Sequence, residues 1–431
     1  MESFVIHGGR PLSGEIVPAG NKNAALPLLA ACLLTEEDVV LRNVPRIRDV
    51  DAMVSLLEGL GVETEWQSGH SIRLRAADVT SAPDADISAQ IRASFLVAGP
   101  LLARLGEVVV APPGGDTIGR RRLDPHLDAF IDLGARVEGD LEMRILAPDG
   151  LNACRIFMDE PSVMGTENAL MAAALTPGPT TIENAASEPH VQDLARMLVG
   201  MGAKIDGIGS NVMTVHGRDK LSGTDHTVGP DHIEVASFMA LAAVTGGELR
   251  IRGVEPTDLH SIRRNFRRLG LQCMIEGHDV LVPPDQRLTI RDDMGDAISK
   301  IDDGPWPAFP ADLTSIALAL ATQASGTVLI FEKMFENRLF FVDKLVAMGA
   351  RITLCDPHRA IVSGPSRLHG ARLESPDIRA GMAMLIAALA AEGRSEIGNI
   401  RQIDRGYERI DERLRVLGAR IERVSPAPVA A

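Results

Sequence analysis

Six stretches of the chain share one pattern of apolar and polar positions. Each begins with a run of Ala, Leu, Ile and Met long enough for a helix, passes through a short glycine or polar turn, and ends in a run typical of a β-strand. The helical runs are apolar nearly all round, which predicts helices inside the protein rather than on its surface. The six stretches are residues 24–44, 93–113, 167–185, 235–254, 315–334 and 381–400.

A second motif recurs between these stretches. Leucine or methionine followed by glycine opens a strand in EGLGVETE, IDLGARVE, VGMGAKID, RRLGLQCM, VAMGARIT and RVLGARIE. Glycine just after a helix is a common C-terminal stop, so each motif predicts the end of one helix and the start of a strand. The glycines lie 73, 68, 68, 79 and 69 residues apart and are Gly61, Gly134, Gly202, Gly270, Gly349 and Gly418.

The two motifs together define a unit of about 70 residues that recurs six times. Each unit holds two helices and several strands, so the chain is predicted to be an α/β protein. Six buried helices divide into two groups of three, which agrees with 431 residues being too long for one ordinary core. A generic α/β protein with chance similarity between its segments is the alternative, and the constant order of both motifs disfavours it.

Charged and polar residues stand directly before the apolar helices. If the buried helices of one domain are parallel, their N-termini gather at one end, where free N–H groups and positive dipole ends bind anions. Basic residues at three of these ends indicate a ligand with several negative charges, such as phosphate plus carboxylate. The residues are Lys22, Asn23, Arg92, Thr166, Glu167, Glu234, Asp312 and Arg379.

Some of these residues also fit a structural role. Threonine and acidic residues often cap helices, so Thr166 and Glu167 carry little weight alone, and Asp312 fits an N-cap as well as a general base. A basic residue at a helix start opposes the helix dipole. Lys22 and the two arginines Arg92 and Arg379 therefore favour a functional interpretation.

The stretch APPGGDTIGRRRLDPHL, residues 111–127, places Asp116 on a proline- and glycine-rich loop just before three arginines. A solvent-exposed loop and a loop that grips an anionic substrate both fit this composition. The glycines favour a mobile loop over 112–122, and Arg120 and Arg122 fit solvated neighbours of Arg121.

Composition narrows the class of protein. A formal net charge of −14 argues against nucleic acid or an anionic membrane as partner unless a basic patch is local. The N-terminal MESFVIHGG lacks a basic region followed by an apolar run, and the longest apolar runs are too short to span a bilayer. We therefore expect a cytoplasmic protein.

The cysteines lie far apart and lack a CxxC spacing, so they predict reduced, mostly buried thiols rather than disulfides or zinc ligands. They are Cys32, Cys154, Cys273 and Cys355.

Longer motifs carry a family resemblance. In chain order they are GNKNAALP, NVPRIRDVDAM, RASFLVAGPLLAR, GGDTIG, PSVMGTENALMAA, FENR, DIRAG and IDRGYERID. With these motifs the chain resembles the enolpyruvyl transferases over essentially its whole length, and most closely the branch that acts on UDP-N-acetylglucosamine.

The resemblance implies a two-domain inside-out α/β barrel, with the active site between the helix N-termini. One domain is expected over 22–229, with the mobile loop 112–122, and the other over 1–21 plus 230–431. The implied reaction moves enolpyruvate from phosphoenolpyruvate to the 3-hydroxyl of UDP-N-acetylglucosamine and releases phosphate, the first committed step of peptidoglycan precursor synthesis. No metal or organic cofactor and no nucleic-acid or membrane partner are implied, and a monomer is favoured.

The resemblance also implies the roles of single residues. Asp312 matches the aspartate proposed to take the sugar hydroxyl proton, and Lys22 and Arg405 match residues around phosphoenolpyruvate. The implied catalytic set is Asp116, Asp312, Lys22 and Arg405. The implied substrate-binding set is Asn23, Arg92, Arg121, Asp124, Pro125, Ser162, Val163, Met164, Met334, Arg338 and Arg379.

The chain departs from the family pattern at four positions. The family loop usually has cysteine where this chain has Asp116, so insensitivity to fosfomycin, which alkylates that thiol, is expected. A protonated carboxylic acid can deliver a proton as a thiol does, whereas three adjacent arginines favour the charged carboxylate. Met164, Thr314 and His232 replace the usual glycine, glutamine and arginine, which puts the choice of acceptor in doubt more than the reaction.

Two alternatives stand beside this function, the first of them motivated by Met164 and Thr314. One is a paralogue that enolpyruvylates another UDP-sugar or a nucleotide, and the other is a non-catalytic UDP-sugar sensor. The retained Lys22, Arg121, Asp312 and Arg405 argue against the sensor.

Overall fold

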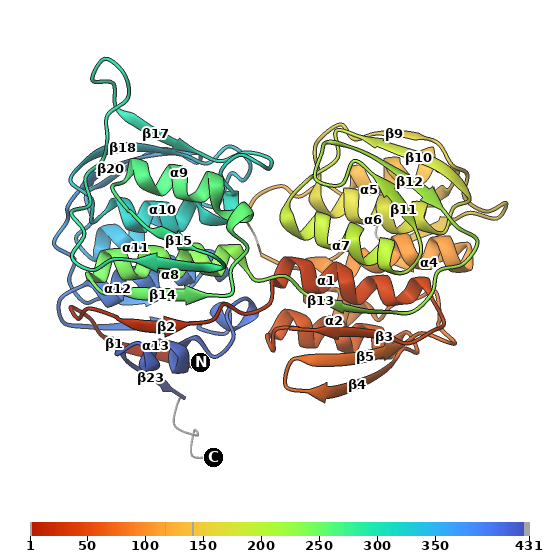
Figure 1. Cartoon of the computed structure of the whole chain (residues 1–431), viewed down its shortest axis with the longest axis horizontal. Helices are drawn as coiled ribbons and strands as arrows, with labels where there is room; N and C mark the ends of the chain where they lie inside the picture. The colour runs from red at the N-terminus through yellow and green to blue at the C-terminus, as the bar shows by residue number, and fades with distance from the viewer. Residues whose placement is uncertain (1, 117, 140–141, 426–431) are drawn as a thin grey trace. The chain divides into compact units, whose positions relative to one another are not determined.

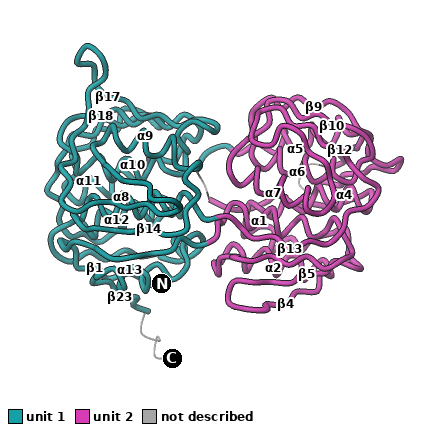
Figure 2. The backbone as a smooth tube through the Cα atoms, in the orientation of Figure 1, with its two compact units in different colours: residues 1–19, 117–120, 230–431 teal, residues 20–116, 121–229 magenta. Residues whose placement is uncertain are grey.

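The computed structural model describes residues 2–116, 118–139 and 142–425, which form two compact units (Figures 1 and 2). Unit 1 comprises the described residues of 1–19, 117–120 and 230–431, and unit 2 those of 20–116 and 121–229. Residues 20 and 21, expected in the discontinuous domain, lie in unit 2, and residues 118–120 of the loop lie in unit 1. Thr117, within the expected mobile loop, lies outside the described residues.

The apolar runs form the buried helices that their all-round hydrophobicity predicts. In unit 1 these helices are α8 (His232–Thr245), α10 (Thr314–Ala321) and α12 (Ile378–Ala390). In unit 2 they are α1 (Lys22–Ala31), α4 (Ala98–Leu105) and α6 (Val163–Ala174). The second and fifth runs begin with 3₁₀ turns, η2 (Arg92–Val97) and η4 (Ala311–Leu313). Lys22 and Arg379 therefore begin α-helices, whereas Arg92 and Asp312 lie in 3₁₀ turns.

A second set of helices ends at the six repeated glycines, as the Leu-Gly and Met-Gly motifs predict. Each glycine has φ between 89° and 107°, and its N–H donates to the carbonyl three residues back. The N–H of the next residue reaches five residues back, as from Val62 to Leu57 and from Ala203 to Leu198. These are Schellman motifs. They close α2 (Arg48–Gly59), α5 (Asp124–Asp132), α7 (Pro189–Gly200), α9 (His260–Arg268), α11 (Val342–Ala347) and α13 (Ile410–Val416).

The described strands form six sheets, three in each unit. In unit 1 the first sheet has the strand order β21 (Arg372–Glu374), β22 (Arg394–Gly398), β1 (Ser3–His7) and β23 (Arg420–Val424). The second has the order β15 (Met274–Glu276), β16 (Asp279–Val282), β14 (Leu249–Arg252) and β2 (Gly14–Ile16). The third has the order β17 (Ser299–Asp302), β18 (Gly326–Phe331), β20 (Arg359–Gly364) and β19 (Ile352–Asp356).

In unit 2 the first sheet has the strand order β11 (Lys204–Asp206), β12 (Val212–Gly217), β10 (Gly178–Glu183) and β9 (Arg155–Phe157). The second has the order β13 (Thr224–Thr227), β3 (Val39–Arg42), β5 (Ser71–Arg75) and β4 (Glu63–Ser68). The third has the order β6 (Glu107–Val110), β8 (Met143–Leu146) and β7 (Arg136–Glu138). Five sheets share one plan, a parallel edge pair followed by two antiparallel neighbours. The sheet of β6 has no parallel edge strand among the described residues. The short elements α3 (Ala85–Ser88), η1 (Cys32–Leu34), η3 (Pro256–Leu259) and η5 (Ile403–Arg405) complete the set.

A positive-φ residue follows the central strand in four repeats. Asn43, Asn184 and Asn399 have φ of 55°, 53° and 52°, and Gly253 has φ of 68°. Each asparagine amide donates to the carbonyl just after the parallel neighbour strand, at 2.8 to 2.9 Å. In the second and fifth repeats this tight turn is replaced by the longer segments 111–122 and 332–341. Both segments contain predicted site residues.

The thiol prediction needs one correction. All four cysteines are free, but only Cys32 is buried, and burial raises its pKa to about 12. Cys154 and Cys273 are half-buried and Cys355 is exposed. The apolar run 24–34 explains the burial of Cys32, whereas the other three lie outside the buried helices. No helix in the described part of the chain is long and apolar enough to cross a membrane.

Candidate active site

Asp312 lies between two buried arginines in unit 1. Its Oδ1 accepts a hydrogen bond from Arg338 Nη2 at 2.9 Å, and its Oδ2 accepts from Arg379 Nε at 3.0 Å. The N-cap positions of η4 and α10 belong to Pro310 and Leu313. The N-cap interpretation of Asp312 is therefore wrong, and its carboxylate instead binds two guanidinium groups.

The burial of this cluster is uneven. The side chains of Arg338 and Arg379 are only 4% and 5% exposed, whereas that of Asp312 is 27% exposed. Burial alone would lower the pKa of each arginine, but Asp312 and the neighbouring carboxylates outweigh it, so the pKa of both is raised. Both guanidiniums stay charged, and the accessible member of the cluster is the carboxylate.

Tyr407 orients Arg379 from the opposite side. Its hydroxyl lies 3.2 Å from Arg379 Nη1 and 3.1 Å from the Ser237 hydroxyl on α8. Burial raises the pKa of Tyr407. The sequence prediction missed this residue, although it is the only tyrosine in the chain and stands in the IDRGYERID motif.

A buried carboxyl pair supports the segment that carries Arg338. Asp303 Oδ1 accepts from the Lys333 N–H at 2.5 Å, and its Oδ2 from the Met334 N–H at 3.3 Å. Glu332 is fully buried and accepts from the Phe335 N–H at 3.2 Å. Burial raises the pKa of Glu332 to about 8, against the opposing charge of Arg338. Sequence reasoning missed both acids, since neither the end of the strand at Glu332 nor the segment around Asp303 carries a distinctive motif.

His232 packs beside the cluster at the start of α8. Its ring lies edge-on to Trp306 with centroids 5.9 Å apart. Burial and the charge of Arg379 lower the pKa of His232 to about 4, with Asp312 opposing them. The histidine is therefore neutral at pH 7.

Lys22 forms a buried ion pair in unit 2. Its Nζ lies 2.7 Å from Asp49 Oδ2, with side chains 10% and 6% exposed. Asn21 caps α1 by accepting from the N–H groups of Asn23 and Ala24. Asp49, in the first turn of α2, offsets the unfavourable position of a lysine at a helix N-terminus. Asp49 was missed, although it stands in the quoted NVPRIRDVDAM motif.

Arg92 contacts the end of the glycine-rich loop. Its Nη2 donates to the carbonyl of Arg121 at 2.5 Å and to that of Arg122 at 3.2 Å. Burial, followed by the positive charge of Arg121, lowers the pKa of Arg92 to about 10. The structure thus brings Arg92 and Arg121 together.

Close packing explains the two glycines before Asp116. A Cβ on Gly114 would lie 1.8 Å from the Ala89 carbonyl oxygen, and one on Gly115 would lie 3.0 Å from Arg92 Cβ. The loop therefore runs against residues 89–92, and Asp116 follows this contact with partial exposure.

Arg122 joins two segments predicted to bind the nucleotide sugar. It pairs with Asp159 at 2.7 Å and with Asp124, the first residue of α5, at 3.3 Å. Arg122 is therefore more than a solvated neighbour of Arg121, and that interpretation is wrong. The sequence could not show this, because Asp159 lies 37 positions further along the chain.

Pro125 and Ser162 lie together at the start of α6. Ser162 caps this helix by accepting from the Gly165 N–H at 3.2 Å. A Cβ on Gly165 would lie 3.0 Å from the Ser162 hydroxyl and 3.2 Å from Pro125 Cβ. Val163 and Met164 begin the helix and pack, partly buried, against the core of unit 2.

His126 and Asn168 form a buried link beneath Arg92. The Asn168 amide nitrogen lies 2.8 Å from His126 Nδ1 and donates to the Phe95 carbonyl, while its oxygen accepts from the Gly99 N–H. Burial and the charge of Arg92 lower the pKa of His126 to about 3. Sequence reasoning missed both residues, although Asn168 stands in the quoted TEN segment.

Thr166 and Glu167 do not cap α6. The Thr166 hydroxyl accepts from the Ala186 N–H at 2.9 Å. Glu167 is 1% exposed, and burial followed by the charge of Glu188 raises its pKa well above the ordinary value. Their positions four and five residues inside the helix make the cap interpretation wrong.

The remaining predicted residues of unit 1 are Arg405, Met334 and Glu234. Arg405 in η5 donates to Gln402 Oε1 at 3.0 Å and stands two positions before Tyr407. Met334 is 37% exposed on the turn held by Asp303. Glu234 Oε1 forms an ion pair with Arg413 Nη1 at 2.5 Å, and Glu234 lies outside the Asp312 cluster.

The chain is similar to known proteins over most of its length. The family model described as EPSP synthase (3-phosphoshikimate 1-carboxyvinyltransferase) matches residues 6–414. A relative from Bradyrhizobium diazoefficiens, named UDP-N-acetylglucosamine 1-carboxyvinyltransferase, is 56% identical over 98% of both chains. A relative of the same name from Treponema denticola is 55% identical over 98% of this chain and 99% of its own.

Solved structures agree with the fold. The enolpyruvyl transferase NikO from Streptomyces tendae has a TM-score of 0.88 at 25% identity and covers 99% of both chains. EPSP synthase from Acinetobacter baumannii, at 19% identity, shares the fold with a TM-score of 0.76 over 99% of this chain and 100% of its own. The predicted fold class is confirmed, and the chain belongs to the enolpyruvyl transferase family, the family of EPSP synthase.

Proposed function

We propose that this chain transfers the enolpyruvyl group of phosphoenolpyruvate to the 3-hydroxyl of UDP-N-acetylglucosamine and releases phosphate. The observation that carries the proposal is identity of 56% over 98% of the chain to a relative named for this reaction. In a bacterial cell the reaction would take place in the cytoplasm as the first committed step of peptidoglycan precursor synthesis. Relatives from several bacterial groups bear the same name at 48% identity or more, so the paralogue and the sensor are not favoured.

The chemistry needs a base, an acid and fixed positive charge. The sugar hydroxyl oxygen bonds to C2 of phosphoenolpyruvate while its proton goes to a base and another proton is added at the C3 methylene. The tetrahedral adduct then loses a proton from C3 and its C2–O bond to phosphate. Cations must hold the phosphate and carboxylate throughout.

Asp312 is assigned as the base in this proposal. It is the exposed member of the cluster, and Arg338 and Arg379 fix both of its oxygens. Substrate phosphate or carboxylate would compete for the same guanidinium N–H groups, so its arrival would release Asp312 to accept the hydroxyl proton. Tyr407 acts as a positioning residue for Arg379.

Unit 2 supplies the second set of charges. By the family resemblance, Lys22, Arg92 and Arg121 are assigned to phosphoenolpyruvate and the diphosphate of the acceptor. Arg405 of unit 1 is assigned to phosphoenolpyruvate on the same ground. Asn23, Met334 and the group Asp124, Pro125, Ser162, Val163 and Met164 are assigned to the nucleotide sugar. The position of Pro125 and Ser162 beside Gly165 supports this grouping.

A phosphate-release assay over an acceptor panel tests the function. Phosphate should appear only when phosphoenolpyruvate and UDP-N-acetylglucosamine are both present. Release with a different UDP-sugar alone would identify a paralogue. Tight binding of UDP-N-acetylglucosamine by folded protein, without phosphate release at any pH, would identify the sensor instead.

Asp116 is assigned as the loop acid that protonates the C3 methylene. Asp116→Ala should reduce phosphate release by roughly 100-fold or more, the usual contribution of a general acid. The wild type should resist fosfomycin, whereas Asp116→Cys should be inactivated progressively with time. Progressive inactivation of the wild type, or an Asp116→Ala rate equal to that of the wild type, would exclude this role.

A further inference from the structure

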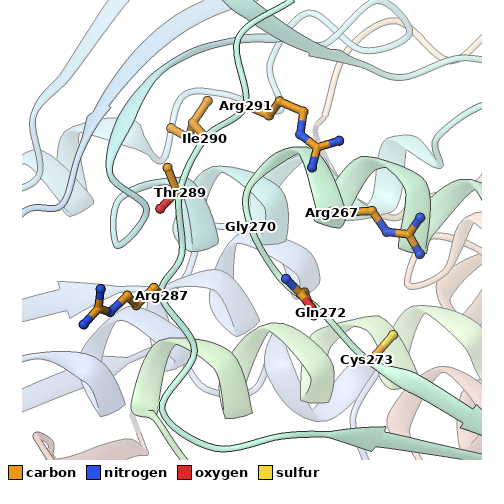
Figure 3. Close-up of a pocket in the computed structure, with 8 residues that line it drawn as sticks. All are labelled: Arg267, Gly270, Gln272, Cys273, Arg287, Thr289, Ile290 and Arg291. Atoms are coloured by element: carbon orange, nitrogen blue, oxygen red, sulfur yellow. The ribbon is translucent and has the colours of Figure 1, made fainter.

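Two pockets of unit 1 have Arg267 and Arg291 in common among their lining residues, and Figure 3 shows the larger pocket. The smaller, of about 310 Å³, is lined by Arg264, Arg267, Arg268 and Arg291. The larger, of about 530 Å³, shares Arg267 and Arg291 and adds Gly270, Gln272, Cys273, Arg287, Thr289 and Ile290. Asp312 and its partners are not among these lining residues, so the pockets are separate from the candidate active site.

The spacing of buried residues on two segments places arginines on both walls of these pockets. On α9, Ile262 and Phe266 are buried and turn the arginines outward. On the facing segment, Leu288 and Ile290 are buried, so their alternate neighbours, including Arg291, point away from the core. A backbone hydrogen bond of 2.9 Å from Arg291 to Arg268 joins the walls.

Gly270 allows this close approach. A Cβ at that position would lie 2.2 Å from the Thr289 backbone nitrogen. The rigid main chain therefore fixes the spacing of the two arginine-bearing segments. In Figure 3 the side chains of Arg267 and Arg291 extend to the same side, with Gln272 below them.

The charges of these arginines are largely uncompensated. Arg268 is paired with Asp293. Within the described residues, Arg264, Arg267, Arg287 and Arg291 have no ion pair and donate no side-chain hydrogen bond. Arg267 lies in the last turn of α9, where the helix dipole stabilises a positive charge. Arg287 and Arg291 on the opposite wall have no such stabilisation. Such a concentration is unusual in a chain with a net charge of −14.

Guanidinium groups bind phosphate oxygens through paired N–H donors, and several together match a ligand with several negative charges. The larger pocket adds the neutral polar groups of Gln272 and Thr289. We propose that the two pockets form a second ligand site for a phosphorylated small molecule with at least two phosphate groups and a neutral polar moiety. Arg264, Arg267 and Arg291 hold the phosphates, and Gln272 and Thr289 face the neutral part.

Cys273 provides a reporter inside the site. It is half-buried on the wall of the larger pocket, while the exposed Cys355 on β19 lies elsewhere and serves as an internal control. Alkylation of each thiol by N-ethylmaleimide is followed by mass spectrometry with and without pyrophosphate or ADP. Pyrophosphate should slow alkylation of Cys273 several-fold, and ADP should slow it further, while alkylation of Cys355 stays unchanged.

A matched pair of double variants tests the arginines. Arg267→Gln/Arg291→Gln should abolish the protection of Cys273. Arg136→Gln/Arg420→Gln removes the same charge from two exposed arginines outside the pockets and should retain it. Both should keep the phosphate-release rate of the wild type without added ligand, since neither touches the candidate active site.

Three results would count against the site. Equal alkylation of Cys273 with and without both ligands would overturn it, and so would protection that survives Arg267→Gln/Arg291→Gln. Equal protection by pyrophosphate and ADP would overturn the assignment of a neutral moiety to Gln272 and Thr289. A failed phosphate-release assay would leave these alkylation results unaffected, so the two proposals are tested separately.

Discussion

Asp312 is bound by two cations that are far more buried than it is. Asparagine keeps the shape of the side chain and one accepting oxygen, but its NH2 group cannot accept from the second guanidinium. One of the two hydrogen bonds is therefore lost together with the proposed base. We expect Asp312→Asn to lower the rate of phosphate release by ~100- to 10,000-fold. Steady-state assays at saturating substrates provide the measurement.

The control for this variant is Asp285→Asn. Asp285 is exposed and has φ of 50°, a conformation that asparagine also tolerates. Its substitution changes the same charge outside the cluster and should leave the rate unchanged. An Asp312→Asn rate within twofold of the control would remove the base assignment.

The buried carboxyl group of Glu332 should make the free energy of unfolding depend on pH. Burial raises its pKa in the folded state from 4.5 to about 8, so the folded state binds more protons than the unfolded state between these values. The contribution of Glu332 to the free energy of unfolding therefore falls as the pH rises through this window. Glu332→Gln keeps a neutral side chain and should become progressively more stable, relative to wild type, from pH 5 to pH 8.

Urea unfolding of both proteins at several pH values measures this difference. Glu374→Gln, on the exposed face of β21, is the control and should show a difference from wild type that does not depend on pH. A constant difference for Glu332→Gln as well would mean that Glu332 is already charged at pH 5.

The residues missed by sequence reasoning share one physical property. Asp49, Tyr407 and Asp303 act through partners that are distant in the chain, as in the 27 positions between Lys22 and Asp49. A single sequence displays residue types and local periodicity but not such pairings. Lys22 and Arg379 were noticed because a basic residue at a helix start conflicts with the local dipole.

At the level of elements, the repeated glycine is the most predictive feature. Gly202 has φ of 107°, and a Cβ there would meet nothing within 4 Å, so its substitution tests backbone conformation alone. Gly202→Ala should lower the free energy of unfolding by ~1–2 kcal/mol. Gly59→Ala in α2 also meets nothing within 4 Å but has helical geometry, and should raise it by ~0.5–1 kcal/mol.

Chemical denaturation of these two variants gives the comparison. The same added methyl group is expected to change stability in opposite directions at the two sites. Equal effects on unfolding would show that φ at the repeated glycine does not stabilise the helix ends.

The repeats also show which parts of the fold could be predicted from the sequence and which could not. Helix ends, buried helices and central strands follow local rules that recur six times, so the fold class could be predicted. The segments 111–122 and 332–341 replace the tight strand-end turns seen at Asn43, Asn184 and Asn399. The described residues of these segments are held by distant contacts, such as Arg92 with the Arg121 carbonyl and Asp303 with the Lys333 N–H.

At the level of the whole molecule, the N-terminal strand completes a sheet made by the C-terminal region. β1 lies between β22 and β23 and is antiparallel to both. Phe4 on this strand is fully buried in the core of unit 1. The sheet therefore cannot form until nearly the whole chain is available.

The two tryptophans make this topology measurable, because Trp66 lies in unit 2 and Trp306 in unit 1. Phe4→Ala should cost ~3–5 kcal/mol through the cavity it leaves. In proteins that keep only one tryptophan, through Trp66→Phe or Trp306→Phe, the denaturation midpoint reported by Trp306 should fall more than that reported by Trp66. His7→Ala, exposed on the same strand, should move neither midpoint appreciably. Equal shifts at both tryptophans would mean that β1 stabilises the chain as one cooperative unit rather than unit 1 in particular.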